Sequence, residues 1–250
     1  MSLQLFINGI SLGSVYALVA VGYCLVFSIL KFTNFAHGAM ITISAFIGYI
    51  CSIWFGLGLF GTLVCSIIGG AIVGIVGERI AFRKITVRGS STFYFFVSSL
   101  TWGTFLEQIV TIRVGSTFRS YPRFFESLVI RLGPDGQFAV STVDVFMLGS
   151  SLVGLVVLFV LLNKTKFGRA IRAASFDRDT TYLMGIDVYR VIQITFMLAG
   201  ALAGLAGVFL GITYTLTAQL GSNIVVKGLI ASVIGGLGNV WGAVIGALML

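Results

Sequence analysis

The chain has 250 residues, of which 58% are hydrophobic and only 10% charged, and its mean hydropathy is +1.07. Soluble domains carry about 25% charged residues, so the composition excludes an ordinary soluble protein and indicates a polytopic membrane protein. The net charge of +8 does not indicate nucleic acid as a partner, because the cations lie between apolar runs rather than in a basic domain.

About seven apolar runs follow one another, each near the roughly 20 residues that a helix needs to cross a bilayer. They are continuous rather than alternating, which favours helices over a barrel. The runs cover residues 5–30, 34–55, 61–82, 91–112, 140–162, 191–213 and 224–250. We therefore expect an all-α fold, a transmembrane bundle forming one domain over residues 1–250. Because the chain ends inside an apolar run, we expect a further C-terminal part beyond Leu250.

Polar residues in the first two runs are candidates for lining a path through the membrane. The first run is long, and is expected to be tilted or broken near Gly13. Asn34 and His37 open the second run, and two interpretations stay open: they cap the helix and bond to nearby backbone, or they line the path. The candidate path residues are Asn8, Ser14, Tyr16, Asn34, His37 and Asn239.

An acid within a membrane run is a functional hypothesis by default. Glu107 lies in the fourth run, and it either has such a role or reaches the interface and pairs with a cation such as Arg113. The polar stretch that follows, residues 113–137, contains the turn sequence Gly-Pro-Asp-Gly at 133–136 and is long enough for a small cap.

Glycines mark the last two runs. Gly200, Gly204, Gly207 and Gly211 fall on one helix face, which predicts close packing against another helix, within the chain or across a subunit interface. The seventh run is interrupted at residues 235–239, and transport proteins place such irregular backbone beside a cavity.

The longest polar interval, Lys164–Arg190, is called the charged segment below. Phe167, Ile171 and Ala174 recur at i, i+4 and i+7, which predicts a short helix with one apolar stripe and with Arg169 and Arg172 on its other faces. A second helical turn is expected after Asp177, ending near Gly185. A segment of this kind indicates a docking partner. The alternative is that it only orients the chain in the membrane.

The distribution of cations predicts the orientation. Lys31, the cations of residues 79–88 and the charged segment fall on one side of the predicted topology. Arg113, Arg119, Arg123, Arg131 and Lys227 fall on the other side. The positive-inside rule therefore places the charged segment in the cytoplasm and the N-terminus outside.

Several chemistries are missing from the sequence. It contains no G-x-x-x-x-G-K-[ST] phosphate loop, and its single histidine and three cysteines form no ligand cluster. We expect neither an enzyme nor a bound metal or cofactor. Few ionisable groups lie in the runs, so energy for transport would come from another protein.

Four segments together resemble one family. They are NGISLGSVYALVAVGYCLVF with NFAHG, ERIAFRKITVRGS, FGRAIRAASFDRDTTYLMGIDVYRV with ALAGLAGVFLG, and GGLGNVWGAVIGALML. In this order they resemble the permease subunits of bacterial ABC importers of the branched-chain amino-acid type, from about Asn8 to Leu250. Lys84 stands where that family usually has proline.

The resemblance implies a multi-pass protein of the bacterial inner membrane. It implies pairing with a second homologous permease subunit, two cytoplasmic ATP-binding subunits that use ATP and Mg²⁺, and a periplasmic substrate-binding protein. Arg169 and Arg172 would contact an ATPase, and Ala170 and Ala173 would stay small for close approach. The implied coupling loop contains Phe167, Gly168, Arg169, Ala170, Ile171, Arg172, Ala173, Asp177 and Gly185.

The substrate stays open between related classes. Branched-chain amino acids are the first expectation, and urea or short amides are the nearest alternative within the same architecture. A self-contained carrier or channel is a further alternative, although the runs show few groups that could couple an ion gradient.

Overall fold

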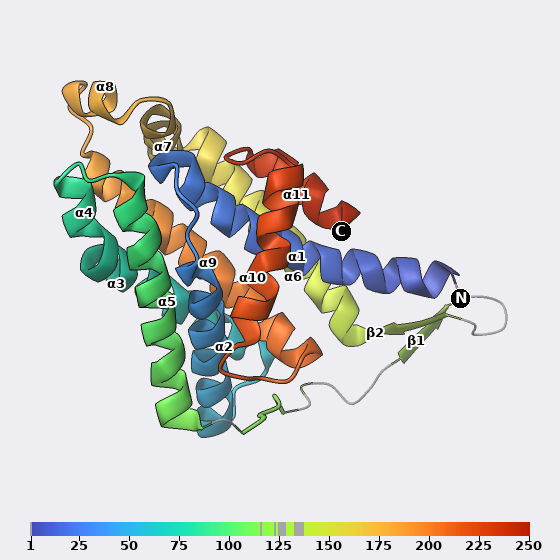
Figure 1. The fold of residues 1–250 in the computed structure, drawn as a ribbon. Coiled ribbons are helices and arrows are strands. Elements are labelled where there is room, and N and C mark those ends of the chain that lie inside the picture. The colour runs from blue at the N-terminus through green and yellow to red at the C-terminus, as the bar shows by residue number, and fades with distance from the viewer. Residues whose placement is uncertain (1, 116, 123, 125–128, 133–137) are drawn as a thin grey trace.

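The computed structural model describes residues 2–115, 117–122, 124, 129–132 and 138–250 (Figure 1). In chain order the elements are α1 (Ser2–Leu30), α2 (Ala36–Phe55), α3 (Leu59–Gly77), the π-helical η1 (Glu78–Phe82), α4 (Arg83–Val87), α5 (Thr92–Val114), β1 (Val129–Leu132), β2 (Phe138–Ser141), α6 (Thr142–Lys164), α7 (Lys166–Phe176), α8 (Arg178–Leu183), α9 (Val188–Thr213), α10 (Leu220–Ile234) and α11 (Val240–Met249).

The predicted helical membrane bundle is confirmed. Among the described residues, five helices are long and apolar enough to cross a membrane, and α10 and α11 are shorter apolar helices. Two short strands depart from the expected all-helical chain, since β1 and β2 pair antiparallel with Val129 opposite Ser141. Strand β1 lies in the polar stretch 113–137 that was expected to form a cap, β2 follows that stretch, and the turn sequence at 133–136 lies outside the described residues.

Helix α1 is one unbroken helix, so the structure excludes a break near Gly13. Its 29 residues span about 43 Å at 1.5 Å per residue, which exceeds the roughly 30 Å of hydrocarbon. A helix of this length either tilts or extends beyond the hydrocarbon. Gly13 packs against α11, and an added Cβ there would lie 3.4 Å from the Ala247 carbonyl oxygen, an ordinary contact distance.

The interior is built on contact between α3 and α9. A Cβ on Gly200 would lie 2.1 Å from the Gly70 carbonyl oxygen, and one on Gly204 would lie 2.2 Å from that of Ser66. No real side chain fits at those distances. The Ser66 hydroxyl also lies 2.7 Å from the Ser44 carbonyl oxygen of α2 and 2.8 Å from that of Gly204. We call Gly70, Gly74, Gly200 and Gly204 the glycine interface.

Two helices begin inside the bundle instead of at its surface. Helix α2 starts at Ala36, after the buried Asn34, and the first turn of α10 crosses it. The approach is close, since a Cβ on Gly38 would lie 2.9 Å from the Gly221 carbonyl oxygen. The Thr42 hydroxyl accepts a hydrogen bond from the Gly221 amide at 2.9 Å.

The interruption predicted at residues 235–239 separates α10 from α11. Gly236 and Gly238 adopt positive φ angles of 91° and 90° there, which glycine tolerates without strain. The turn is fixed to α1, because the Gly238 amide donates to the Cys24 sulfur at 3.1 Å.

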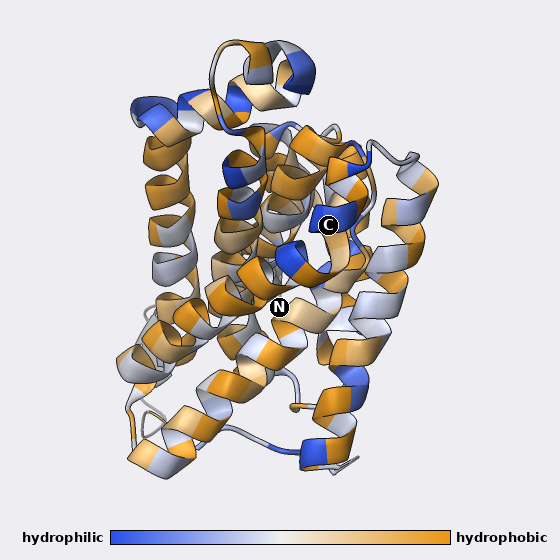
Figure 2. Cartoon of the chain, turned by 90° about the vertical axis from the view of Figure 1, so that its left-hand side faces the viewer, coloured by the Kyte–Doolittle hydropathy of each residue, from blue (hydrophilic) through white to orange (hydrophobic). Residues whose placement is uncertain are grey.

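Hydrophilic residues gather at one end of the molecule, over α7 and α8, while the bundle itself is mostly hydrophobic (Figure 2). We call the end that carries α7 and α8 the coupling end, and the opposite end, where α2 finishes at Phe55, the outer end (Figure 1). At the outer end, Tyr121 ties the loop after α5 to the bundle by donating a hydrogen bond to the Ala45 carbonyl oxygen at 2.6 Å.

Candidate coupling surface and translocation path

The helix predicted in the charged segment exists as α7, but its inner stripe differs from the prediction. Ile171 and Ala174 are buried as expected, whereas Phe167 is 59% exposed and Gly168 takes its place. A Cβ on Gly168 would lie 2.0 Å from the Leu162 carbonyl oxygen. The end of α6 therefore approaches α7 where only glycine fits, and this contact turns Phe167 outward.

The outer face of α7 presents apolar and cationic groups together. Phe167 and Arg169 are exposed, and Phe176, at the end of the helix, is 95% exposed. Ala173 is exposed and Ala170 half-buried. Phe176 follows Arg172 by four residues and Arg169 by seven, so these three share one side of α7, whereas Phe167 lies on another side. An exposed Phe beside cations is suited to a protein partner that offers a hydrophobic cleft and carboxylates.

Arg172 has a structural contact that distinguishes it from Arg169. Its guanidinium donates to the Leu162 carbonyl oxygen and to Asn163 Oδ1, the latter at 3.4 Å. A cation at the C-terminal carbonyls of α6 stabilises that helix end. Arg169 is therefore the cleaner candidate for a docking contact.

Asp177 organises the second helix of the charged segment. Its Oδ1 accepts from the amides of Asp179 at 2.9 Å and Thr180 at 3.3 Å, and the Thr180 hydroxyl donates to its other oxygen. The Thr180 hydroxyl and these amides hold the pKa of Asp177 below its usual value. Helix α8 ends at Leu183, and Gly185 follows with φ of 80°, a conformation that favours glycine.

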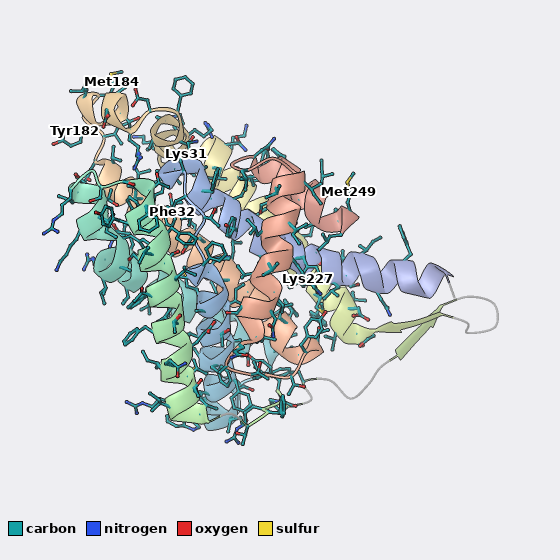
Figure 3. The ribbon with its side chains drawn as sticks, viewed as in Figure 1. Lys31, Phe32, Tyr182, Met184, Lys227 and Met249 are labelled. Carbon is teal, nitrogen blue, oxygen red and sulfur yellow. The ribbon has the colours of Figure 1, made fainter. Side chains whose placement is uncertain are left out.

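A cleft of about 690 Å³ lies under α8 at the coupling end. Its walls come from the end of α1, the α4–α5 connection and the start of α9 as well as from α7 and α8. Tyr182 and Met184 project from the far end of this segment (Figure 3), and both are exposed.

A buried ion pair beneath this end was not predicted from the sequence, in which Arg83 was only one of the cations of residues 79–88. Arg83 Nε and Nη2 donate to the two carboxylate oxygens of Glu78 at 2.6 and 2.9 Å. The Glu78 side chain is 1% exposed. The Arg83 guanidinium also lies 5.8 Å from the ring centre of Tyr189, at the start of α9.

The structure separates the candidate path residues. Asn34 accepts a hydrogen bond from the Ala36 amide at 3.2 Å, and His37 is fully buried against Gly22 and Tyr23. Asn239 caps α11 by accepting from the amides of Trp241 and Gly242. The Asn34 bond is of the kind expected near a helix start, whereas both His37 ring nitrogens are buried without a hydrogen-bond partner, so the expected bond from His37 to nearby backbone is not present.

Asn8 and Ser14, the other two candidates on α1, also lie apart from each other. Ser14 donates to the Ser11 carbonyl oxygen within α1, and Asn8 lies on the exposed outer part of that helix. Tyr16 meets groups from two other elements: Lys227 donates to its hydroxyl at 3.1 Å, and the Tyr214 hydroxyl lies 3.0 Å away.

The structure changes the interpretation of two ionisable residues within the membrane bundle, Lys227 and Glu107. Lys227 was counted with the cations of the outer side, near the start of the last apolar run, and it lies in the middle of α10. Glu107 does not form the suggested ion pair with Arg113; instead its carboxylate accepts a hydrogen bond from the Ser222 hydroxyl of α10. The spacing of apolar residues could not show either contact, because both join helices far apart in the chain.

The glycine face of α9 meets partners within the same chain. Gly200 and Gly204 contact α3, Gly207 contacts α2 near the Ile41 carbonyl oxygen, and Gly211 packs against Leu216 and Tyr121. Of the two alternatives left open for this face, the contacts within the chain account for all four glycines.

A bundle of this kind, with helices that begin inside it and a helical extension at one end, is a multi-pass membrane protein of the transport class. Residues 5–250 match the family described as branched-chain amino acid transport system / permease component. The chain belongs to this family.

Similar proteins cover nearly the whole chain. The high-affinity branched-chain amino acid transport system permease protein LivH of Salmonella typhimurium is 32% identical over 259 residues, covering 99% of this chain and 83% of LivH. The corresponding BraD of Pseudomonas aeruginosa is 29% identical with the same coverage. The probable branched-chain amino acid transport permease protein LivH of Methanocaldococcus jannaschii is 31% identical over 241 residues, 93% of this chain and 74% of the relative. These matches support the amino-acid interpretation and not the urea or amide alternative.

Proposed function

We propose that this chain is the permease subunit of an ATP-driven importer that moves branched-chain amino acids across the bacterial inner membrane. It pairs with a second homologous permease subunit to enclose the path. Two cytoplasmic ATP-binding subunits, which use ATP and Mg²⁺, drive it, and a periplasmic binding protein delivers the substrate. The chain itself performs no catalysis.

The observation that carries the proposal is the outer face of α7 in a member of this family. Arg169 and Phe176 are exposed on one side of a helix that is fixed to α6 at Gly168. A partner that grips this face would transmit force to α6 through Gly168, and to α9 through the short connection after α8. Alternating access then follows from two states of the ATPase pair with different contacts to α7.

The test is uptake of labelled leucine, with urea as competitor, in vesicles that contain the whole assembled transporter. Native vesicles are expected to accumulate leucine only with internal ATP, and excess urea is expected not to compete. Arg169→Glu is expected to lower uptake by about tenfold or more, because it reverses a charge at the docking face.

Lys84→Glu provides the matched control. It reverses an exposed charge in α4, at the same end of the molecule but outside the charged segment, and is expected to leave uptake near native. Uptake that is independent of ATP, or that Arg169→Glu leaves unchanged in correctly inserted protein, would show that the charged segment only orients the chain.

A further inference from the structure

The cleft under α8 brings charged side chains of both signs together at the coupling end. Its volume of about 690 Å³ is in the range of sites that bind small molecules. Lys31 lines it from the end of α1, and Arg178 and Asp179 line it from the start of α8. Both ion pairs found among the described residues involve other side chains, so these three have no ion-pair partner within that part of the chain. Their charges are available to a ligand.

Lys31 has a backbone conformation that rarely carries a side chain. Its φ is 55°, and among the described residues it is the one residue other than glycine with a positive φ. The turn has a structural purpose, because the Lys31 amide closes α1 by donating to the Phe27 carbonyl oxygen at 2.9 Å and the chain then enters the core at Phe32 (Figure 3). Glycine makes such a turn without strain, and other residues held in this region are concentrated at ligand clamps and switch regions. The turn explains the angle, and the charged cleft explains the lysine.

Arg178 supplies a second cation, and it is half-buried. A guanidinium that is partly removed from water is costly without an anionic partner. The neighbouring Asp177 is occupied, because its carboxylate accepts the amides of Asp179 and Thr180. An anionic group of a ligand would therefore meet two cations in this cleft, and a cationic group would meet the carboxylate of Asp179.

One part of the cleft wall is apolar. Five of its lining residues are buried hydrophobic side chains: Ile29, Leu30, Phe95, Ala174 and Val188. The charges that line the cleft balance, with two cations and two carboxylates, so the carboxylates repel a phosphate and the cations repel an amine. An aliphatic α-amino acid carries one charge of each sign and an apolar side chain, and it matches all three parts of the lining.

The cleft joins two parts of the chain that the proposed function moves separately. The end of α7 and α8 form one wall, and the end of α1, the α4–α5 connection and the start of α9 form the other. A ligand that contacts Arg178 on one wall and Lys31 on the other stabilises the arrangement in which the cleft is closed around it. It therefore resists displacement of α7 by the ATPase pair.

We propose that this cleft binds the zwitterion of a free aliphatic amino acid at the cytoplasmic end, with Lys31 and Arg178 at its carboxylate and Asp179 at its ammonium group, and that the bound molecule slows import. The inference rests on the proposed function and adds a regulatory site for the same class of substrate. The internal amino acid is the product of import, so the rate falls as the product accumulates. Urea and short amides carry neither charge and leave the three side chains unpaired.

The test measures the initial rate of labelled leucine uptake in vesicles that contain the whole transporter, with the binding protein outside and ATP inside. Vesicles are loaded with unlabelled leucine, with urea or with neither. Internal leucine is expected to lower the native rate about fivefold or more, and internal urea is expected to leave it unchanged.

Two variants remove the cations of the cleft. Lys31→Gly keeps the backbone turn, because glycine adopts this φ without strain, and Arg178→Met removes the guanidinium. Both are expected to import at the native rate without internal leucine and to lose the response to it. Lys84→Met is the matched control, since Lys84 is an exposed cation at the same end that does not line the cleft, and it is expected to respond as native.

Direct binding gives a readout that does not depend on transport. Equilibrium dialysis of labelled leucine against the purified assembled transporter, without the binding protein, is expected to show a site that Lys31→Gly weakens about tenfold or more, the effect of losing one charge-assisted hydrogen bond. Partner subunits must copurify with both variants at the native level. Their loss would show that the cleft receives the ATPase instead, and would overturn the inference.

The outcomes distinguish the two proposals. If native vesicles import leucine and internal leucine slows them no more than it slows Lys31→Gly vesicles, the inference fails and the proposed function stands. If native vesicles do not import leucine, the proposed function fails and the regulation of import fails with it. The dialysis then decides the site alone, and equal binding by native protein and Lys31→Gly would overturn that too.

Discussion

The glycine interface and the charged segment use glycine for opposite purposes. At the interface, Gly70 and Gly200 let two long helices touch backbone to backbone, and every neighbour is buried. In the charged segment, Gly168 fixes only the inner side of α7 while Phe167 and Phe176 stay exposed. The residues of the glycine interface contact one another and stabilise the bundle. The charged segment leaves apolar surface uncovered, which is costly in water unless a partner covers it.

The largest effect is expected from filling the glycine interface. Gly200→Val would place side-chain atoms inside the backbone of α3, and the resulting overpacking is expected to cost more than about 3 kcal/mol of unfolding free energy. Inserted, protease-resistant protein should be nearly absent in membranes. Gly149→Val is the control, because a Cβ there meets nothing within 4 Å; equal yields of the two variants would contradict the interpretation of the interface.

The next largest effect is expected at the ion pair of Glu78 and Arg83. Arg83→Met leaves the buried Glu78 carboxylate without its cation, which is expected to cost about 3–5 kcal/mol. Circular dichroism during thermal unfolding in detergent measures this loss. The double variant Glu78→Gln with Arg83→Met is expected to recover much of it, because no charge then stays buried. A double variant as unstable as Arg83→Met alone would show that packing, not charge, holds the site.

A change on the outer face of α7 is expected to leave stability nearly untouched. Phe176→Ser removes a side chain that is 95% exposed, so the free energy of unfolding should change by less than about 0.5 kcal/mol. Leucine uptake by the assembled transporter should nevertheless fall sharply, since the ATPase loses an anchoring contact. If Phe176→Ser unfolds the protein, or if the variant transports leucine normally, the contrast between the glycine interface and the outer face of α7 is wrong.

The smallest effect is local and depends on pH. Because the folded state lowers the pKa of Asp177, its carboxylate stabilises α8 above the ordinary aspartate pKa of about 3.9. This stabilisation is lost as pH falls through the folded pKa. Hydrogen exchange of residues 178–183, corrected for intrinsic rates, should therefore show less protection in acid, while α9 is unchanged. Asp177→Asn should remove the pH dependence, and a response identical to native would assign it to another group.

The sequence predicted most of this architecture because membrane helices leave a strong signal. The apolar runs, the interruption at residues 235–239 and the glycine face of α9 depend on local composition, which a bilayer constrains closely. The helix of the charged segment was predicted too, but Phe167 was assigned to its inner stripe. Periodicity gives a helix and its faces, whereas the approach of α6 at Gly168 decides which face is covered.

The contacts that the sequence could not predict depend on tertiary structure. Glu78 and Arg83 are five residues apart, a spacing that diverges on an α-helix, but the π-helical turn of η1 brings them together. The sequence placed Lys227 in the last apolar run but could not name its partner. Its contact with Tyr16 joins residues 211 positions apart in the chain, and no local pattern encodes such a distance.

The Ser66 hydroxyl has a consequence for motion. It has one proton but lies within hydrogen-bond distance of two carbonyl oxygens, one on α2 and one on α9. A hydroxyl can donate to only one of them at a time, and rotation about a single bond exchanges the acceptors. A small shift of α9 against α2 would therefore leave α3 with a hydrogen bond to one of the two helices, and the Ser66 donor would stay paired.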